Sequence, residues 1–245
     1  MSRLLQLQEE LKHVRERLGA ETSIRQVLVF GSLAADATHQ WSDLDLIVIE
    51  DTNLPFLERS LRLSRIVKPR VGTQFLVYTP DEIRALSGRL FVEAEMLAKA
   101  KVLPMKPLDD AERWLEFARQ DLRVAELALS EGIYNQTCFH AQQCAEKCLK
   151  ACLAAQGELL PRTHLIVDLI SRLPETIRSM LGSLEDDLSA LDQFYIPTRY
   201  PDALPGILPD GLPDRSHAET SLTVARRCYE AVMRKVEGER REGEA

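Results

Sequence analysis

The chain has 245 residues, of which 45% are hydrophobic and 28% charged, enough for one large domain or two ordinary ones with a core in each. The net charge of −7 arises after residue 102, where 24 acidic side chains face 17 basic ones, and this sign argues against wrapping duplex nucleic acid. No apolar run approaches the roughly 18 to 20 residues that span a bilayer, and the charged, helical N-terminus is not typical of a cleavable signal. We therefore expect a globular, soluble, cytoplasmic protein without a membrane partner.

The first hundred residues alternate helical and strand patterns, which is typical of an α/β layer domain. Apolar, β-branched runs predict three strands, at residues 24–30, 44–50 and 73–79. Helical patterns surround them, at about residues 2–18, 55–67 and 81–101. The pattern predicts a small mixed sheet with flanking helices over residues 1–104.

From Asp109 onward the strand patterns end, and residues 105–245 are predicted to form an all-α helical bundle. The predicted helices cover about residues 109–130, 133–156, 164–173, 175–195 and 215–238. Five prolines between residues 197 and 213 exclude both a helix and a central strand there. The charged tail after residue 236 is expected to fray.

The predicted helix at 133–156 carries three of the five cysteines at every fourth residue, Cys144, Cys148 and Cys152. Residues at this spacing stack along one helix face, too far apart for unstrained disulfides, so reduced thiols are expected. A zinc site of His140, Cys144 and Cys148 is a weaker alternative, because one straight helix rarely supplies tetrahedral ligands. We interpret this stripe of small residues as a surface for helix packing.

Two short motifs point to chemistry. Asp43 and Asp45 share one side of a strand, and two carboxylates this close repel each other unless a cation lies between them. Mg²⁺ takes such ligands together with substrate phosphates. Gly31 and Ser32 follow the strand 24–30, where a close backbone approach, free N–H groups and a hydroxyl can hold a phosphate. Each motif alone is more often a turn or a strand edge, but together they predict phosphoryl or nucleotidyl transfer.

The run Phe30-Gly31-Ser32, ten further residues and then Asp43-Leu44-Asp45-Leu46 resembles the signature of minimal nucleotidyltransferases of the polymerase-β-like superfamily, over roughly residues 20–102. The resemblance implies that Gly31 and Ser32 contact the nucleotide phosphates and that Asp43 and Asp45 ligate Mg²⁺.

The chain departs from this family pattern at two positions. Many members have glycine where this chain has Asp36. Most also carry a third carboxylate early in the next core strand, where alignment of residues 71–82 places Gln74, and an amide is no useful base. Asp81 or Glu82 can replace that carboxylate only if the loop folds back.

The segments HAQQCAEKCLKACL, RTHLIVDLI and YIPTRYPDA resemble the HEPN family (higher eukaryotes and prokaryotes nucleotide-binding), over roughly residues 109–238. Several members are ribonucleases with an Arg-x4-6-His motif, and none of the five histidines here has arginine at that spacing. Arg199 remains as a candidate for holding a phosphate, with Tyr200 stacking on a base. Equally, Arg199 can pair with Asp192 and have no catalytic role, and His164 reads as a helix-start residue.

These resemblances predict an enzyme that binds ATP, or another nucleoside triphosphate, with Mg²⁺ and transfers NMP to a hydroxyl of a protein or small molecule. Separate proteins of the two families often form toxin–antitoxin pairs in which the transferase modifies the HEPN partner with AMP. Two alternatives stay open: a nucleotide-binding module whose catalysis was lost through Gln74, and an atypical HEPN ribonuclease around Arg199. The HEPN resemblance also implies a homodimer.

Overall fold

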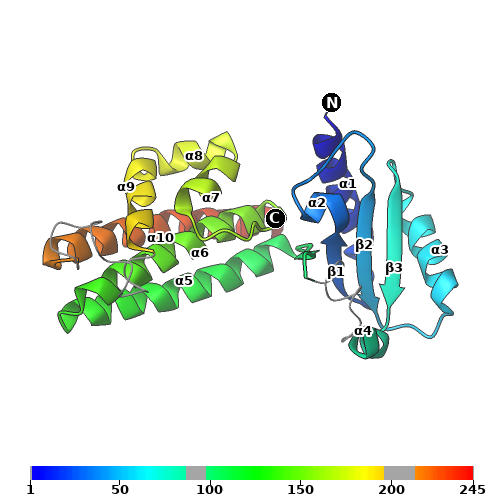
Figure 1. Ribbon diagram of the computed structural model, residues 1–245, viewed down its shortest axis with the longest axis horizontal. Coiled ribbons are helices and arrows are strands. Elements are labelled where there is room, and N and C mark those ends of the chain that lie inside the picture. The colour runs from blue at the N-terminus through cyan, green and yellow to red at the C-terminus, as the bar shows by residue number, and fades with distance from the viewer. Residues whose placement is uncertain (1, 87–97, 196–212, 245) are drawn as a thin grey trace. The chain divides into compact units, whose positions relative to one another are not determined.

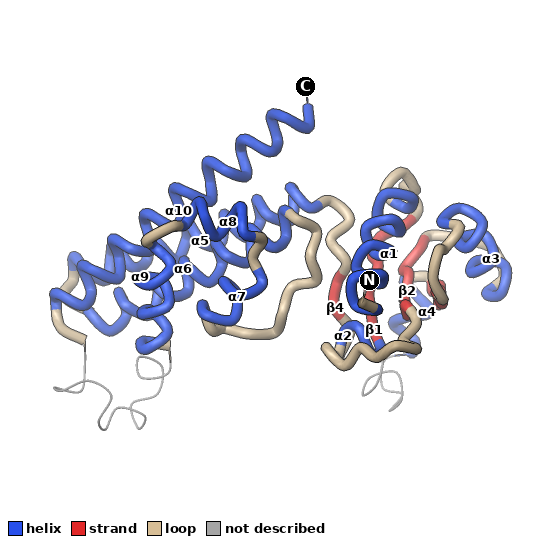
Figure 2. Tube along the Cα trace, turned by 90° about the horizontal axis from the view of Figure 1, so that it is seen from above, coloured by secondary structure: helices blue, strands red, loops and turns tan. Residues whose placement is uncertain are grey.

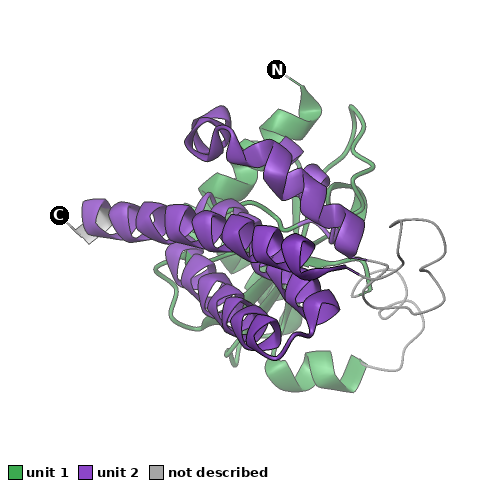
Figure 3. Ribbon diagram, turned by 90° about the vertical axis from the view of Figure 1, so that its left-hand side faces the viewer, with its two compact units in different colours: residues 1–106, 157–160 green, residues 107–156, 161–245 purple. Residues whose placement is uncertain are grey.

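The computed structural model describes residues 2–86, 98–195 and 213–244, and it divides into two compact units (Figure 3). One unit consists of residues 1–106 with 157–160, and the other of residues 107–156 with 161–245. Among the helices in the described ranges, none combines the length and the apolar character that a bilayer crossing requires.

The N-terminal unit is built on a four-stranded mixed sheet with the strand order β3-β2-β1-β4. Figure 1 shows β1, β2 and β3, and Figure 2 labels β4 beside β1. Its strands are β1 (Ile24–Phe30), β2 (Leu44–Glu50), β3 (Thr73–Tyr78) and β4 (Lys101–Val102). Strand β1 runs antiparallel to β2 and to β4, whereas β2 and β3 are parallel. The three longer strands match the predicted positions, because alternating or continuous apolar runs mark strands whose faces are buried.

The helices that flank this sheet in the described part of the unit are α1 (Arg3–Leu18), α2 (Gly31–Ala34), α3 (Phe56–Val67) and α4 (Pro80–Leu86). One face, with Val29 and Leu46, packs in the main core against the apolar sides of α1 and α3. The other face carries a small cluster around Leu28 and Ile47, with partly buried side chains of α4 against it. Because strand side chains alternate, Asp45 lies on the second face together with Ile47.

The prediction of one helix over residues 81–101 is wrong. Helix α4 is described as Pro80–Leu86, whereas Lys101 and Val102 are not helical and form β4, in register with Val29 and Leu28 of β1. Residues 87–97 lie outside the described residues. A two-residue strand has no periodicity of its own, so only its pairing with the edge of β1 creates it.

In its described residues the C-terminal unit has helices and no strand, as predicted. Its elements are α5 (Pro107–Ser130), α6 (Tyr134–Ala155), α7 (Ile166–Arg172), α8 (Glu175–Leu181), α9 (Leu184–Ala190), the 3₁₀ helix η2 (Leu191–Phe194) and α10 (Arg215–Glu244). The long helices α5, α6 and α10 pack side by side, as Figures 1 and 2 show. Gly132 sits between α5 and α6 with a positive φ of 72°, which allows the tight reversal.

Two further expectations for this unit are wrong. The single helix predicted at 175–195 is divided into α8, α9 and η2, since Gly182 adopts a φ of 52° that ends α8. The tail does not fray at residue 237, because α10 continues to Glu244. Arg240 on this last stretch contacts Asp109 and Glu112 of α5, at 2.7 and 2.6 Å, and ties the helix end down.

The cysteines pack in the helical core. All five are free thiols and buried, four of them on α6. Burial raises the pKa of Cys138 to about 11 and that of Cys148 well above the usual range, so these thiols stay protonated at neutral pH. His140 lies 2.9 Å from the carboxylate of Asp121 on α5. These contacts support the packing interpretation of the stripe.

Candidate active site

The Gly31-Ser32 turn begins where β1 ends, and it opens α2, a single helical turn. Gly31 has a positive φ of 70°, which is costly for residues with a Cβ atom. A Cβ at this position would also lie closer than 3.0 Å to Oδ2 of Asp45, nearer than real Cβ atoms approach other heavy atoms. The backbone of this turn therefore touches the second carboxylate of the predicted metal site.

Asp45 is the half-buried member of the carboxylate pair. It lies in β2 directly opposite Phe30, the last residue of β1. Burial raises the pKa of Asp45, and the nearby charge of Asp43 raises it further. A cation between the two carboxylates would relieve both effects, which is the electrostatic condition predicted from the sequence.

Asp43 precedes β2 and exposes 62% of its side chain. Arg3 on α1 holds it, with Nη2 3.6 Å from Oδ1 of Asp43 and Nε donating to the carbonyl oxygen of Ser42 at 2.8 Å. The backbone of Gly72 also lies against the Asp43 carboxylate, too close for a Cβ at position 72. Sequence reasoning missed Arg3, because a contact over 40 residues leaves no local signal.

Gln74 lies beside Asp45, with which it is paired in the parallel register of β2 and β3. Its side chain is exposed and shares the sheet face of Asp45. Glu82, named as a possible substitute, is instead bound to Arg59 and to the backbone N–H of Thr79. These contacts lower the pKa of Glu82 to about 2, so it is an ion-pair partner and not a base.

The donor set fits a hard divalent cation. Mg²⁺ is usually bound by one or two carboxylates and completed by water and substrate phosphates. Asp43, Asp45 and the amide oxygen of Gln74 supply this kind of oxygen ligand. Within the described ranges, no group of three or more His, Cys, Asp or Glu side chains is arranged to hold a metal, so substrate oxygens would have to complete the coordination.

Asp36, where many nucleotidyltransferases have glycine, adopts the left-handed conformation with a φ of 55°. This backbone geometry explains the glycine preference, because side chains other than those of Asp and Asn are strained there. In this chain the carboxylate accepts a bond from Nζ of Lys101 at 3.0 Å, and the Lys101 side chain is only 7% exposed. With aspartate instead of glycine at position 36, the backbone is strained at this residue, but the loop gains an ion pair with Lys101 of β4.

We expect Asp36→Gly to destabilise the protein by about 1 kcal/mol, because relief of about 1 kcal/mol of strain is outweighed by an unpaired, buried Lys101. In a Lys101→Met background Asp36→Gly should instead stabilise the protein, because the ion pair is already absent and the substitution only relieves the backbone strain. Urea unfolding of the four proteins measures both values. An equal effect of Asp36→Gly in the two backgrounds would contradict this explanation.

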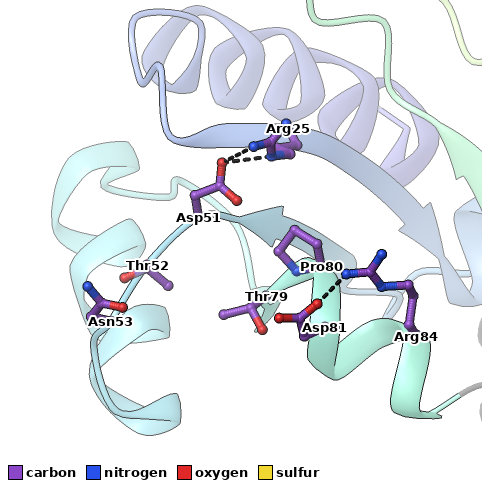
Figure 4. Close-up of a pocket in the computed structure, with 8 residues that line it drawn as sticks. All are labelled: Arg25, Asp51, Thr52, Asn53, Thr79, Pro80, Asp81 and Arg84. Carbon is purple, nitrogen blue, oxygen red and sulfur yellow. Dashed lines mark hydrogen bonds and ion pairs between the residues drawn. The ribbon is translucent and has the colours of Figure 1, made fainter.

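One large pocket lies away from this site. A cavity of about 700 Å³ lies at the opposite end of the sheet, near the start of α4 (Figure 4). It is lined by Arg25, Asp51, Thr52, Asn53, Thr79, Pro80, Asp81 and Arg84. Asp43 and Asp51 precede and follow β2, so about 26 Å of strand separates them. The arginines in this pocket pair with its own aspartates, Arg25 with Asp51 and Arg84 with Asp81, so its charges offset each other.

A smaller cavity, of about 320 Å³, lies beside Arg3. It is lined by Arg3, Gln6, Glu9, Glu10, Arg70 and Val71. Because Arg3 also contacts Asp43, this cavity borders the carboxylate site, and its volume is within the range of small-molecule sites.

The helical unit holds a buried polar cluster on α6. Glu146 accepts from Nζ of Lys150 at 2.7 Å and lies 3.2 Å from Nδ1 of His164. The ring of His164 stacks on Tyr195 at 5.3 Å. His164 is therefore fixed by an acid and an aromatic ring, while the adjacent Thr163 accepts the Leu165 N–H at the helix start.

Arg199, the candidate for holding a phosphate, and Tyr200, the candidate for stacking on a base, lie outside the described residues. Asp192, the alternative partner of Arg199, accepts the backbone N–H groups of Ile166 and Val167 at 2.8 and 3.1 Å. It therefore caps the N-terminus of α7.

Family models match both parts of the chain. A model described as "Nucleotidyltransferase domain" matches residues 11–96, which contain the Gly31-Ser32 turn and both carboxylates. A model described as "HEPN domain" matches residues 111–236, about half of the chain.

Three relatives each match about half of the chain. A protein of Methanocaldococcus jannaschii named "Putative toxin MJ1304" is 26% identical over 130 residues, which are 50% of this chain and 85% of the relative. The crystal structure of TT1696 from Thermus thermophilus is 39% identical, covers 51% of this chain and 97% of its own, and has a TM-score of 0.46. The structure of ST0689, "an archaeal HEPN homologue", is 32% identical with the same coverage and a TM-score of 0.41.

The fold and the matches agree on both parts of the molecule. The mixed sheet that carries Asp43 and Asp45 belongs to the region matched as a nucleotidyltransferase domain, and the helical unit to the region matched as HEPN. The chain therefore belongs to the HEPN family and joins its HEPN domain to an N-terminal nucleotidyltransferase domain.

Proposed function

We propose that the chain is a Mg²⁺-dependent nucleotidyltransferase that transfers AMP from ATP, or NMP from another nucleoside triphosphate, to a hydroxyl of a protein or small molecule. One observation carries this proposal. Asp45 is half-buried, its pKa is raised by burial and by Asp43, and its carboxylate touches the backbone of Gly31. A carboxylate pair in this state beside a glycine turn favours a divalent cation and the phosphates that accompany it.

The reaction needs positioning and charge neutralisation. The acceptor oxygen forms a bond to the α-phosphorus, the bond from that phosphorus to the oxygen bridging to the β-phosphorus breaks, and pyrophosphate leaves with the electron pair. A bound Mg²⁺ would neutralise charge on the phosphates. Asp43 and Asp45 would hold it, and Ser32 would donate to a phosphate oxygen. Gln74 has no useful basicity, so we assign the acceptor proton to solvent water.

The domain combination supports a proposal for the class of acceptor. The relative named as a toxin supports a toxin–antitoxin-like role, in which transfer takes place within the chain or to a separate protein partner. The cavity beside Arg3, next to Asp43, keeps a small-molecule hydroxyl as the second acceptor class.

The direct test is incubation of the purified chain with ATP labelled at the α-phosphate and Mg²⁺, followed by intact-mass spectrometry. Added AMP mass on the chain, or label transferred to a supplied acceptor with release of pyrophosphate, is the expected result. ATP labelled at the γ-phosphate should transfer nothing, because that phosphate leaves. Absence of saturable ATP binding would overturn the proposal.

A nucleotide-binding module without catalysis is the second candidate, and the register of Gln74 beside Asp45 favours it. We expect Gln74→Asp to raise the rate of transfer by about 10²-fold or more, since a positioned base contributes roughly 10²–10⁴-fold. Gln74→Ala is the control, because it removes the amide without adding a base. Wild-type protein that binds ATP but transfers nothing, together with transfer by Gln74→Asp, would identify a decayed enzyme. If Gln74→Asp leaves the rate of transfer unchanged, Gln74 neither limits the rate of an active enzyme nor accounts for a loss of catalysis.

We also propose a homodimer through the HEPN domain. Three apolar side chains lie exposed along α5, Phe117, Val124 and Leu127, at spacings that place them on one face of the helix. Sedimentation of the full chain checks this assembly. The free thiol state of the cysteines supports a reducing compartment such as the cytoplasm.

A further inference from the structure

Trp41 has an unusual position for a tryptophan, because it lies two residues before Asp43 and exposes 78% of its surface. Large aromatic side chains normally bury most of their surface, since it contributes strongly to folding and binding. The other tryptophan, Trp114, is partly buried on α5 with Nζ of Lys150 5.4 Å above its ring. The high exposure of Trp41 is thus specific to its position in the loop before Asp43 and is not shared by Trp114.

The turn that presents Trp41 is well bonded. The backbone N–H of Ser42 donates to the carbonyl oxygen of His39 at 3.0 Å, and the N–H of His39 donates to Oγ of Ser42 at 3.0 Å. The N–H of Trp41 points to Nδ1 of His39 at 3.3 Å. Ser42 itself is buried. The turn therefore holds the backbone of Trp41 in one place while the indole stays in solvent.

The same turn is coupled to the carboxylate site at both ends. Upstream, the N–H of Ala37 donates to the carbonyl oxygen of Ser32 at 2.9 Å, which ties the loop to the predicted phosphate turn. Downstream, Arg3 bonds the carbonyl oxygen of Ser42 and pairs with Asp43. Trp41 therefore lies in the segment that connects the phosphate-binding and metal-binding residues.

We propose that Trp41 is the stacking surface for the nucleobase of the bound nucleoside triphosphate. This inference rests on the proposed nucleotidyl transfer. When the phosphates lie at Gly31 and Ser32 and the cation at Asp43 and Asp45, the base needs a flat apolar partner beside them. An indole fixed by its backbone supplies one, and stacking on an aromatic face accepts any base. This contact would make Trp41 a substrate-binding residue that does not select among bases by hydrogen bonding.

Affinity measurements separate the base from the phosphates. By calorimetry with Mg²⁺, Trp41→Ala should bind ATP at least about fivefold more weakly than wild type, the lower end of what one stacked base contributes. Trp41→Phe should retain most of the affinity. Inorganic tripolyphosphate, which has no base, should bind wild type and Trp41→Ala equally. Leu57→Ala is the matched control, because Leu57 on α3 is 75% exposed and should not affect ATP binding.

Fluorescence provides a second readout. In a Trp114→Phe background, Trp41 is the remaining tryptophan, and ATP with Mg²⁺ should quench its emission saturably without any acceptor. ATP affinity equal in wild type and Trp41→Ala, or emission unchanged at saturating ATP, would overturn the inference while leaving nucleotidyl transfer standing. A fluorescence change only on adding a protein acceptor would overturn it in favour of acceptor docking. If wild type does not bind ATP at all, both the inference and the proposed function fall.

Discussion

Asp45→Asn should abolish nucleotidyl transfer and at the same time stabilise the metal-free protein. The rate should fall by about 10³-fold or more, because the cation that the carboxylate helps to hold contributes several kcal/mol to the transition state. Stability should rise by about 0.5–1 kcal/mol after allowing for solvent screening, because the charge of Asp45 is disfavoured by burial and by Asp43. The transfer assay and urea unfolding in EDTA measure the two effects.

The pH dependence of this gain has a defined sign. A carboxyl whose pKa is raised on folding destabilises the native state fully above the folded pKa, and this penalty decreases as the pH falls and disappears below the ordinary value of 3.8, where both states are protonated. The advantage of Asp45→Asn should therefore be largest near neutral pH and be lost once the pH is well below 3.8.

Two comparisons make the expectation specific. Asp43→Asn should also abolish transfer but should not stabilise the fold, since it gives up the ion pair with Arg3. Asp51→Asn, at the far end of the same strand, should leave transfer intact, because Asp51 pairs with the exposed Arg25 far from the site. Full transfer by Asp45→Asn would refute the assignment of this carboxylate to the metal.

Gly31→Ala should damage both the stability of the nucleotidyltransferase domain and its activity. The positive φ of 70° costs a residue with a Cβ about 1–2 kcal/mol, and the new methyl group would collide with the carboxylate of Asp45. Displacing this carboxylate by about 1 Å should lower the rate by about 10²-fold. Urea unfolding and the transfer assay on the same preparation measure the two losses.

Gly132→Ala is the matched control for backbone strain. Gly132, between α5 and α6, has nearly the same φ of 72°, but its nearest neighbour for a Cβ is the hydroxyl of Tyr134 at 4.0 Å. This variant should lose about the same strain energy and keep full transfer. If Gly31→Ala and Gly132→Ala have equal effects on transfer, the contact between Gly31 and Asp45 has no role in catalysis.

The sequence by itself determined the features that depend on local patterns. Apolar runs marked β1, β2 and β3, and the spacing of Gly31 and Asp43 indicated the nucleotidyltransferase domain, now matched by a family model. The alignment put Gln74 at the position of the third carboxylate, and the register of β2 and β3 pairs this residue with Asp45. The length of a strand, the alternation of apolar and polar side chains and the turn residues each depend on about ten consecutive residues. They can therefore be predicted without knowledge of the fold.

Only the tertiary structure decided the contacts that complete the site. The contact of Arg3 with Asp43 spans 40 residues and that of Lys101 with Asp36 spans 65, and β4 exists only through its pairing with β1. Such contacts depend on which distant segments the fold brings together. They could not be predicted from the sequence, because side chains that pair over long sequence separations follow no period and no fixed spacing.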